Sequence, residues 1–297
     1  MATGMWTAVS GAVAQQQNVD VVANNLANAD TLGFKKDAPT FKEYLATVER
    51  NHDGVEVPRG PIKDKELYPL DGKDQAFVIT DGTYTNFKQG NLRVTQSPLD
   101  VAMDGPGFLE VSTPSGIRYT RQGSLKMAMD GRLVTSDGYP VLASQAGGLA
   151  AAQPSSTVQP GQGRPATQGG VAVDQNNPAA ARFINLRDRP GVLTIGPSGE
   201  IYSGEDLIAK LSVVEFNDSR KLVKQGGVLF GNADLTNLST APARTQVRQG
   251  LIETSNVNPV EEMTRLLQAN RLFEHDLKAM KTYGELLSKE VNELGKL

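Results

Sequence analysis

The chain has 297 residues, enough for one large domain or two to three smaller ones, and its net charge is −3. A charge balance this close to neutral gives no basic footprint, so we expect no nucleic-acid partner. There is no cysteine, which excludes disulfides, thiol catalysis and cysteine-ligated metals.

The first predicted element is a helix within residues 1–30, running from about 4 to 28. Its apolar side chains recur at alternating three- and four-residue steps, which is typical of a narrow seam that needs a partner helix: Met5, Ala8, Ala12, Val19, Val22 and Leu26. Asp20 is the only ionisable side chain before Asp30. Because charges are costly to desolvate, we interpret this helix as surrounded by protein on most sides, in preference to a merely polar, solvated helix.

Residues 31–74 are predicted to be an extended linker. The segment contains four prolines and a charged stretch over 59–66, and proline disfavours regular structure. We expect at most one short helix there, around 40–50.

Residues 75–224 are predicted to form a β-rich, antiparallel central domain, a sandwich or a barrel-like body. Short alternating runs are separated there by Asp-Gly turn signals, beginning with Asp81-Gly82 and Asp104-Gly105. The low-complexity stretch 144–180 lacks large apolar groups, and we interpret it as an insert hung from this domain. Residues 225–254 are predicted to be a return linker.

The last predicted element is a helix within 255–297, ending near residue 294. Asn258 is a good N-cap, Pro259 suits the first helical position, and Glu261 completes a capping-box-like pattern. The seam spacing returns here, through Met263, Leu266, Phe273, Leu277, Met280, Leu287, Val291 and Leu294. The predicted fold is therefore α+β, with discontinuous, coiled-coil-forming terminal helices flanking an all-β antiparallel central domain.

The sequence contains no motif typical of a catalytic, metal-binding or phosphate-binding site. There are only two histidines, His52 and His275, and no metal-ligand spacing, phosphate-binding loop or nucleophile elbow. We therefore expect no catalytic residue, no cofactor, no metal and no small-molecule substrate. No run approaches the ~20 apolar residues that span a bilayer, so membrane insertion is not expected.

Two terminal segments resemble the signatures of bacterial flagellar rod and hook proteins. The first, over 23–35, contains Asn24, Asn25, Leu26, Asn28, Gly33, Phe34 and Lys35; the second, over 255–263, contains Asn256, Asn258, Pro259 and Glu261. Segments 89–92, 98–102, 104–108 and 119–124 are similar to the central body of that family. Segments 83–87 and 213–216 resemble the proximal-rod members most, with the distal-rod members as the close alternative.

This resemblance implies a non-catalytic structural subunit whose terminal helices pack with other copies of itself into a helical tube that transmits torque for motility. The implied partners are further copies, neighbouring rod proteins and the flagellar type III export apparatus, without a cleaved Sec signal. The implied location is the periplasm-spanning rod of the basal body. Asn24, Asn25 and Asn28 would end the first helix and satisfy backbone groups, Gly33 would permit a turn, and Phe34 would anchor the linker against the helices.

Two other classes of function remain open at this point. One is a soluble binding module whose terminal helices form an ordinary intramolecular hairpin. The other is an envelope hydrolase, which would need an acidic or nucleophilic site that the sequence does not display. Stable helicity in the dilute chain would favour the binding module.

Overall fold

The computed structural model describes residues 2–46, 75–144, 180–187, 192–239 and 244–294. The chain divides into two compact units. The helical unit comprises residues 1–27, 37–84 and 258–297, and the β unit comprises residues 28–36 and 85–257. Each unit is therefore assembled from segments that are distant in the sequence.

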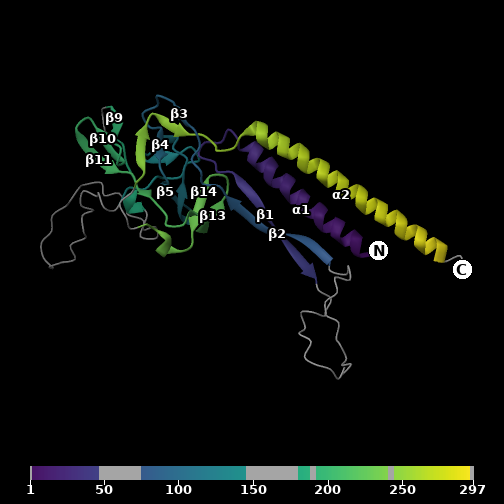
Figure 1. Ribbon diagram of the computed structural model, residues 1–297. Coiled ribbons are helices and arrows are strands. Elements are labelled where there is room, and N and C mark those ends of the chain that lie inside the picture. Colours follow the sequence, from purple (N-terminus) through teal and green to yellow (C-terminus); the bar gives the residue numbers. More distant parts are fainter. Residues whose placement is uncertain (1, 47–74, 145–179, 188–191, 240–243, 295–297) are drawn as a thin grey trace, which may run out of the picture. The chain divides into compact units, whose positions relative to one another are not determined.

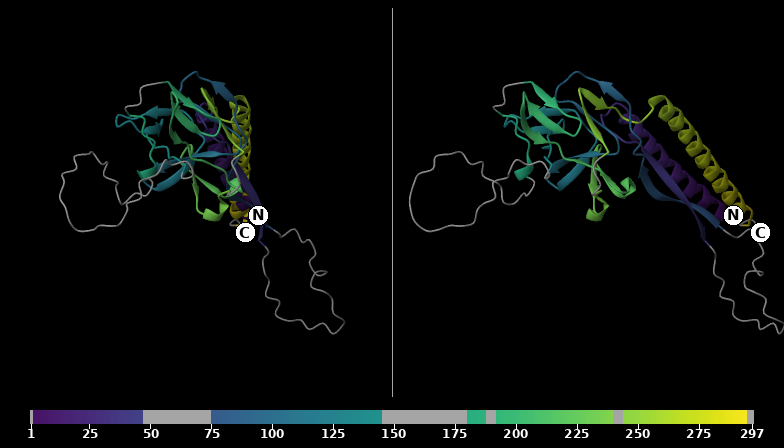
Figure 2. Two further views of the ribbon diagram at one scale, coloured as in Figure 1. Left: turned by 90° about the vertical axis from the view of Figure 1, so that its left-hand side faces the viewer. Right: turned by 60° about the vertical axis from the view of Figure 1, so that its left-hand side comes forward.

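The helical unit contains the two long helices of the structure, α1 (Ala2–Ala27) and α2 (Pro259–Leu294). They pack side by side (Figures 1 and 2), and both chain ends lie at the same end of the pair, so the helices are antiparallel. Asn258 caps α2: its side-chain oxygen accepts a hydrogen bond from the backbone N–H of Val260 at 3.2 Å. The two predicted helices are thus confirmed, with α1 shifted by one or two residues at its ends.

The helical unit also contains a two-stranded sheet of β1 (Asp37–Ala46) and β2 (Gln75–Thr85). The predicted helix around 40–50 is wrong, because its described part belongs to β1; residues 47–50 lie outside the described residues. The hydroxyl of Thr40 donates to the carbonyl of Gly82 at 3.1 Å, and pairing of this kind overrides a weak local helix preference. The turn predicted at Asp81-Gly82 is also wrong, because both residues lie inside β2.

The β unit is built from short strands. Their bounds are β3 (Leu92–Val94), β4 (Val101–Asp104), β5 (Phe108–Thr113), β6 (Gly116–Thr120), β7 (Leu125–Met127), β8 (Leu133–Thr135), β9 (Leu193–Ile195), β10 (Glu200–Ser203), β11 (Asp206–Lys210), β12 (Val213–Val214), β13 (Leu222–Gln225), β14 (Leu229–Asn232), β15 (Gln246–Gln249) and β16 (Leu251–Glu253). Short 3₁₀ turns lie at Ala180–Arg182, Ser219–Lys221 and Leu235–Asn237. The largest sheet has the order β12-β5-β6-β14-β13, and its pairs are antiparallel, as predicted for the central domain.

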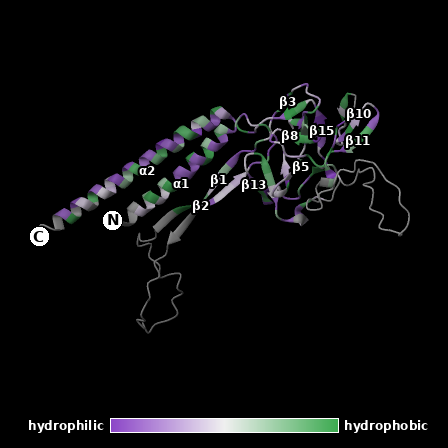
Figure 3. Cartoon of the chain, turned by 180° about the vertical axis from the view of Figure 1, so that it is seen from behind, coloured by the Kyte–Doolittle hydropathy of each residue, from purple (hydrophilic) through white to green (hydrophobic). Residues whose placement is uncertain are grey.

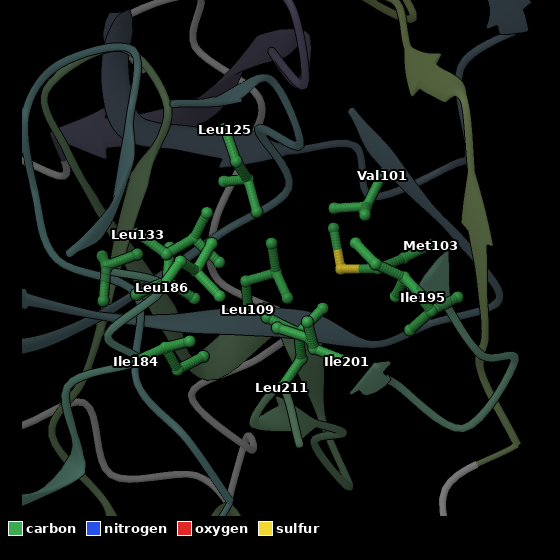
Figure 4. Close-up of a cluster of buried hydrophobic side chains, with 13 residues drawn as sticks. Val101, Met103, Leu109, Leu125, Leu133, Ile184, Leu186, Ile195, Ile201 and Leu211 are labelled. Carbon is green, nitrogen blue, oxygen red and sulfur yellow. The ribbon is translucent and has the colours of Figure 1, made fainter. Parts of the chain in front are cut away.

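Two hydrophobic clusters flank β5. Successive side chains of a strand point to opposite faces, so Leu109 and Val111 enter the larger cluster, while Phe108 enters an aromatic one with Tyr119 and Phe230. Figure 4 shows Leu109 among side chains from distant parts of the β unit: Met103 of β4, Ile201 of β10 and Leu211, which follows β11. The Phe108 and Phe230 rings meet edge to face with centroids 5.7 Å apart. The buried core of the β unit thus lies on both faces of β5.

The return linker predicted over 225–254 differs from the structure, which places β14, β15 and β16 there. β15 pairs with β4 and β16 pairs with β3. Each of these strands buries only one or two side chains, such as Val247 and Ile252. The alternation of apolar and polar residues is therefore too short to predict these strands from the local sequence. Phe183 and Asn185 each form an isolated bridge rather than part of a strand, and residues 145–179 of the predicted insert lie outside the described residues.

Candidate functional site: helix faces and signature residues

The covered face of α1 contains the described residues of its predicted seam. Ala12 and Val22 are buried, and Ala8, Val19 and Leu26 are half-buried; the side chain of Met5 lies outside the described residues. Asp20 is exposed. These apolar residues recur at three- and four-residue steps, so they form one stripe along the helix.

The residues on the covered face of α2 are spaced more regularly along the helix than those of the predicted seam. Its buried and half-buried positions step by four and three residues, through Glu262, Leu266, Ala269, Phe273, Asp276 and Met280. Of the predicted seam, Leu266, Phe273 and Met280 lie on this face. Met263 and Leu277 are exposed, and the side chain of Leu287 lies outside the described residues. The intervening positions are occupied by Glu262, Ala269 and Asp276, which a search for apolar residues alone does not select.

The two helices approach closely at Gly11. A Cβ atom placed on Gly11 would lie 3.4 Å from Oδ2 of Asp276, which is an ordinary van der Waals contact. Glu262 has no exposed surface, and its Oε1 lies 4.0 Å from Nε of Arg265 on the same helix. The packed face of α2 is therefore partly acidic rather than wholly apolar.

The helical unit exposes many large apolar side chains. Trp6 is 57% exposed, Leu267 is 61% exposed and Val260 is 72% exposed. The others are Val13 on α1; Met263, Leu272, Leu277, Tyr283, Leu286 and Val291 on α2; and Phe41, Val78, Ile79 and Tyr84 on the two strands. Figure 3 shows apolar residues recurring along both helices. Surfaces of this kind mark sites of protein association.

The three asparagines of the first signature differ in burial and in hydrogen bonding. Asn25 is buried; its Nδ2 donates to the carbonyl of Asp37 at 2.7 Å, and its Oδ1 accepts from the N–H of Asp37 at 2.9 Å. Asn28 lies beyond the end of α1, where its carbonyl accepts from the N–H of Thr31 at 3.2 Å. Asn24 is exposed. Only Asn25 is thus a fully buried polar link to β1.

Gly33 forms a turn that other residues do not fit. Its φ is +71°, and a Cβ atom there would lie 2.6 Å from the backbone carbon of Arg121. The next residue, Phe34, is buried with Ala29, Val228 and Val257, all within the β unit. Its predicted packing against the helices is therefore replaced by packing within the β unit. Nζ of Lys224 lies 3.7 Å from the centre of the Phe34 ring.

Lys35 belongs to a buried ion cluster. Its Nζ lies 2.6 Å from Oε1 of Glu253, and Nη1 of Arg121 lies 3.1 Å from Oε2 of the same carboxylate. Lys35 also donates to the carbonyl of Lys88 at 2.7 Å, and Arg121 donates to the carbonyl of Gly105 at 2.5 Å. The side chains of Lys35 and Glu253 have no exposed surface. Burial lowers the pKa of Lys35 to about 8, a shift that the charge of Glu253 opposes.

Asn256, from the second signature, binds two other segments. Its Oδ1 accepts from the N–H of Lys36 at 2.8 Å, and its Nδ2 donates to the carbonyls of Asn86 at 2.8 Å and Lys88 at 3.0 Å. Its own backbone N–H donates to the carbonyl of Phe34 at 3.4 Å. The two signatures, although at opposite ends of the sequence, therefore meet in the β unit. Asn258 and Pro259 cap and begin α2, and exposed Glu261 pairs with Arg265 at 2.6 Å.

The sequence did not point to Glu253 or Arg121 as site residues. Glu253 precedes the second signature, and Arg121 lies inside the quoted segment 119–124 without an assigned role. Lys35 and Glu253 are 218 residues apart, and Arg121 and Glu253 are 132 residues apart. A fully buried carboxylate needs cationic partners, but no local pattern identifies a charged residue as buried.

Comparison with known proteins adds three family matches. The model described as "Flagella basal body rod protein" matches residues 5–35, "Flagellar hook protein FlgE/F/G D1 domain" matches residues 102–203, and "Flagellar basal body rod FlgEFG protein C-terminal" matches residues 248–294. The flagellar basal-body rod protein FlgG of Borreliella burgdorferi is 31% identical over 291 residues, with 97% of each chain covered. The chain belongs to the flagellar basal-body rod protein family.

Other relatives in this family carry two different names. The rod protein FlgF of Caulobacter vibrioides is 29% identical over 298 residues, with both chains fully covered. The rod protein FlgG of Bacillus subtilis is 26% identical over 301 residues, covering 98% of this chain and 99% of that one. Membership establishes a structural rod subunit of the flagellar basal body. Among the described residues, no helix is long and apolar enough to cross a membrane, and no acidic or histidine cluster could hold a metal ion.

Proposed function

We propose that this rod protein is a non-catalytic subunit of the proximal rod, which assembles through α1 and α2 into a helical tube that transmits torque. The observation that carries this proposal is the number of large apolar side chains left exposed on the helical unit, such as Trp6, Val260 and Leu267. Fully burying one such side chain contributes about 1.5–3 kcal/mol, so the exposed set is a strong drive for association.

The type of interface follows from what a rod requires. A head-to-tail contact between unlike surfaces that does not close into a ring generates an open helical filament. Exposed apolar side chains occur on both helices, so one helix can contact one neighbour while the other contacts the next. The partners are further copies of the chain and neighbouring rod proteins. Delivery is by the flagellar type III export apparatus.

The proximal position in the rod rests on the resemblance of segments 83–87 and 213–216 to proximal-rod members. The alternative is a distal-rod subunit, and the FlgF relative at 29% identity and the FlgG relative at 31% identity do not separate the two positions. Antibody labelling of purified basal bodies separates these two positions, because a proximal subunit is labelled only at the end of the rod nearest the motor.

A non-assembling binding module of the envelope is the other alternative. Pairing of α1 with α2 inside one chain is compatible with both functions, so helix pairing alone does not choose between them. The exposed apolar residues favour assembly, because a helix pair that remained in solvent would ordinarily present a polar outer face.

The test is the substitution Leu267→Asp, with Met263→Asp as a second variant. Both side chains are exposed, so the monomer is expected to fold normally while the apolar contact is lost. Gln268→Asp is the matched control, because it introduces the same charge one residue away at another exposed position. We expect the two apolar variants to be missing from purified basal bodies and the control to be present. Normal incorporation of both apolar variants would contradict the proposal.

A further inference from the structure

The chain passes between the two units four times: it enters the β unit after Ala27, leaves after Lys36, returns at Thr85 and leaves after Val257. Residues 33–36, 86–90 and 253–257 lie on the β side of the last three passages, and we call them the exit segments. Load carried along the chain from β1, β2 or α2 enters the β unit at these segments, whereas α1 joins it at Asn28.

All three exit segments are bound to one another. Oε1 of Glu253 accepts hydrogen bonds from Lys35 Nζ at 2.6 Å and from the N–H of Gly90 at 2.8 Å. The backbone carbonyl of Glu253 accepts a hydrogen bond from the N–H of Gly33 at 2.9 Å. Asn256 contacts the other two segments in the same way, through the N–H of Lys36 and the carbonyls of Asn86 and Lys88. Each exit segment therefore holds hydrogen bonds to both of the others.

The chemistry of these bonds favours a cooperative unit. The Glu253 carboxylate is buried with two cations and a backbone donor, and charge-assisted bonds are about twice as strong as neutral ones. Removing one partner leaves the remaining buried polar groups unsatisfied, which penalises partial opening. Phe34, next to Lys35 in the chain, packs against Val228 and Val257, so apolar burial also links the first and third exit segments.

We propose that Lys35, Glu253 and Asn256 form a clamp that holds the three exit segments in one register, so that these segments open together and before the β core. The clamp fixes the ends of the β unit from which the chain continues into β1 and α2 and to which it returns from β2. It acts in a free monomer as well as in an assembly, so its test does not depend on the proposed function.

The test is residue-resolved amide hydrogen exchange of the full-length chain carrying Glu253→Gln. The directly bonded amide is Gly90, whereas the amides of Gly33 and Lys36 are bonded to the Glu253 carbonyl and to Asn256. A clamp predicts that all three amides exchange faster together, by at least about tenfold, because loss of one charge-assisted bond opens the whole unit. The core amides of Leu133 and Val141 are expected to keep their wild-type rates.

Asn256→Ala is the second variant and removes only neutral bonds. It should accelerate exchange at Gly90, which is not among the hydrogen-bond partners of Asn256. Glu110→Gln is the matched control, because Glu110 is another buried carboxylate of the β unit, paired with Arg182 and Ser212; it should leave the exit amides unchanged. Acceleration restricted to Gly90 in Glu253→Gln and to Lys36 in Asn256→Ala would overturn the clamp, as would equal acceleration of the core amides.

Discussion

Asn25 and Asp37 are joined by two reciprocal hydrogen bonds, from Asn25 Nδ2 to the Asp37 carbonyl at 2.7 Å and from the Asp37 N–H to Asn25 Oδ1 at 2.9 Å. A side-chain amide presents a donor and an acceptor side by side, which matches the carbonyl and the N–H of one residue's main chain. The last turn of α1 is thereby fixed to the first residue of β1, within the helical unit.

The pair predicts that Asn25→Ala destabilises the helical unit. Loss of the amide removes both hydrogen bonds to the half-buried main chain of Asp37, and a hydrogen bond of this kind contributes about 0.5–1.5 kcal/mol. Asn25→Asp should also destabilise it, since a carboxylate cannot donate to the Asp37 carbonyl. Chemical denaturation followed by helical circular dichroism measures the change, with exposed Gln17→Ala as the control. Equal midpoints for Asn25→Ala and Gln17→Ala would show that the pair is unimportant.

Gly33→Ala is expected to be more damaging than Gly226→Ala. Both glycines have positive φ, +71° and +79°, so both substitutions carry the backbone penalty of about 1 kcal/mol for a left-handed residue. A Cβ atom at Gly33 would lie 2.6 Å from Arg121 main chain, whereas nothing lies within 4 Å at Gly226. The difference in unfolding free energy therefore isolates the steric contribution. Similar losses for both variants would mean that the chain at Gly33 can move away.

The lowered pKa of Lys35 predicts a pH dependence of stability. Burial lowers this pKa to about 8 from the ordinary value of 10.5, so between these pH values the unfolded chain binds more protons than the folded one. The Lys35 contribution to the unfolding free energy should therefore rise as pH rises through this window, by at most about 1.4 kcal/mol per pH unit. Below pH 8 the full penalty of charging the buried amine is present.

Denaturation of the wild type and of Lys35→Met from pH 7 to 10.5 checks this dependence. Tyrosines titrate in both chains, so only the difference between the two curves reports Lys35. A difference that falls or stays flat across the window would contradict the assignment.

Phe273→Asp and Leu267→Asp should behave differently in the isolated chain. Phe273 is half-buried on the face of α2 that packs against α1, whereas Leu267 is largely exposed. Phe273→Asp is therefore expected to loosen the helix pair by about 3–5 kcal/mol, in the range of large core truncations, and to block assembly while the β unit stays folded. Leu26→Asp should act likewise from α1. Thermal circular dichroism at the helical minimum should show lowered helicity for Phe273→Asp and Leu26→Asp and unchanged helicity for Leu267→Asp. Unaltered helix melting in Phe273→Asp would contradict the packing of Phe273 against α1.

Much of the helical unit could be predicted from the sequence. Both helices, the cap at Asn258 and half of the packed face of α2 follow from local patterns. Met263 and Leu277 were assigned to that face because they are apolar, but the alternate packed positions are held by Glu262, Ala269 and Asp276. A hydrophobic search cannot select a buried carboxylate, because burial of a charge depends on tertiary partners.

Other features depend on contacts between distant residues. β1 was missed because its pairing with β2 joins residues far apart in the chain, such as Thr40 and Gly82, which are 42 positions apart. β15 and β16 were missed because each buries one or two side chains against partners near the start of the β unit. The resemblance singled out Gly33, Phe34, Lys35 and Asn256, yet only the structure joins them with Glu253 and Arg121.

Site-specific photo-crosslinking in living cells tests the central claim, that the exposed apolar residues of the helical unit are contacts between rod subunits. A photoreactive phenylalanine analogue is placed at Leu267, and at Asp137, an exposed turn residue of the β unit, for comparison. The account predicts that irradiation of assembled basal bodies links position 267 to another copy of the chain or to a neighbouring rod protein, identified by mass spectrometry. Recovery of only uncrosslinked chain at position 267, in basal bodies that contain the protein, would contradict it.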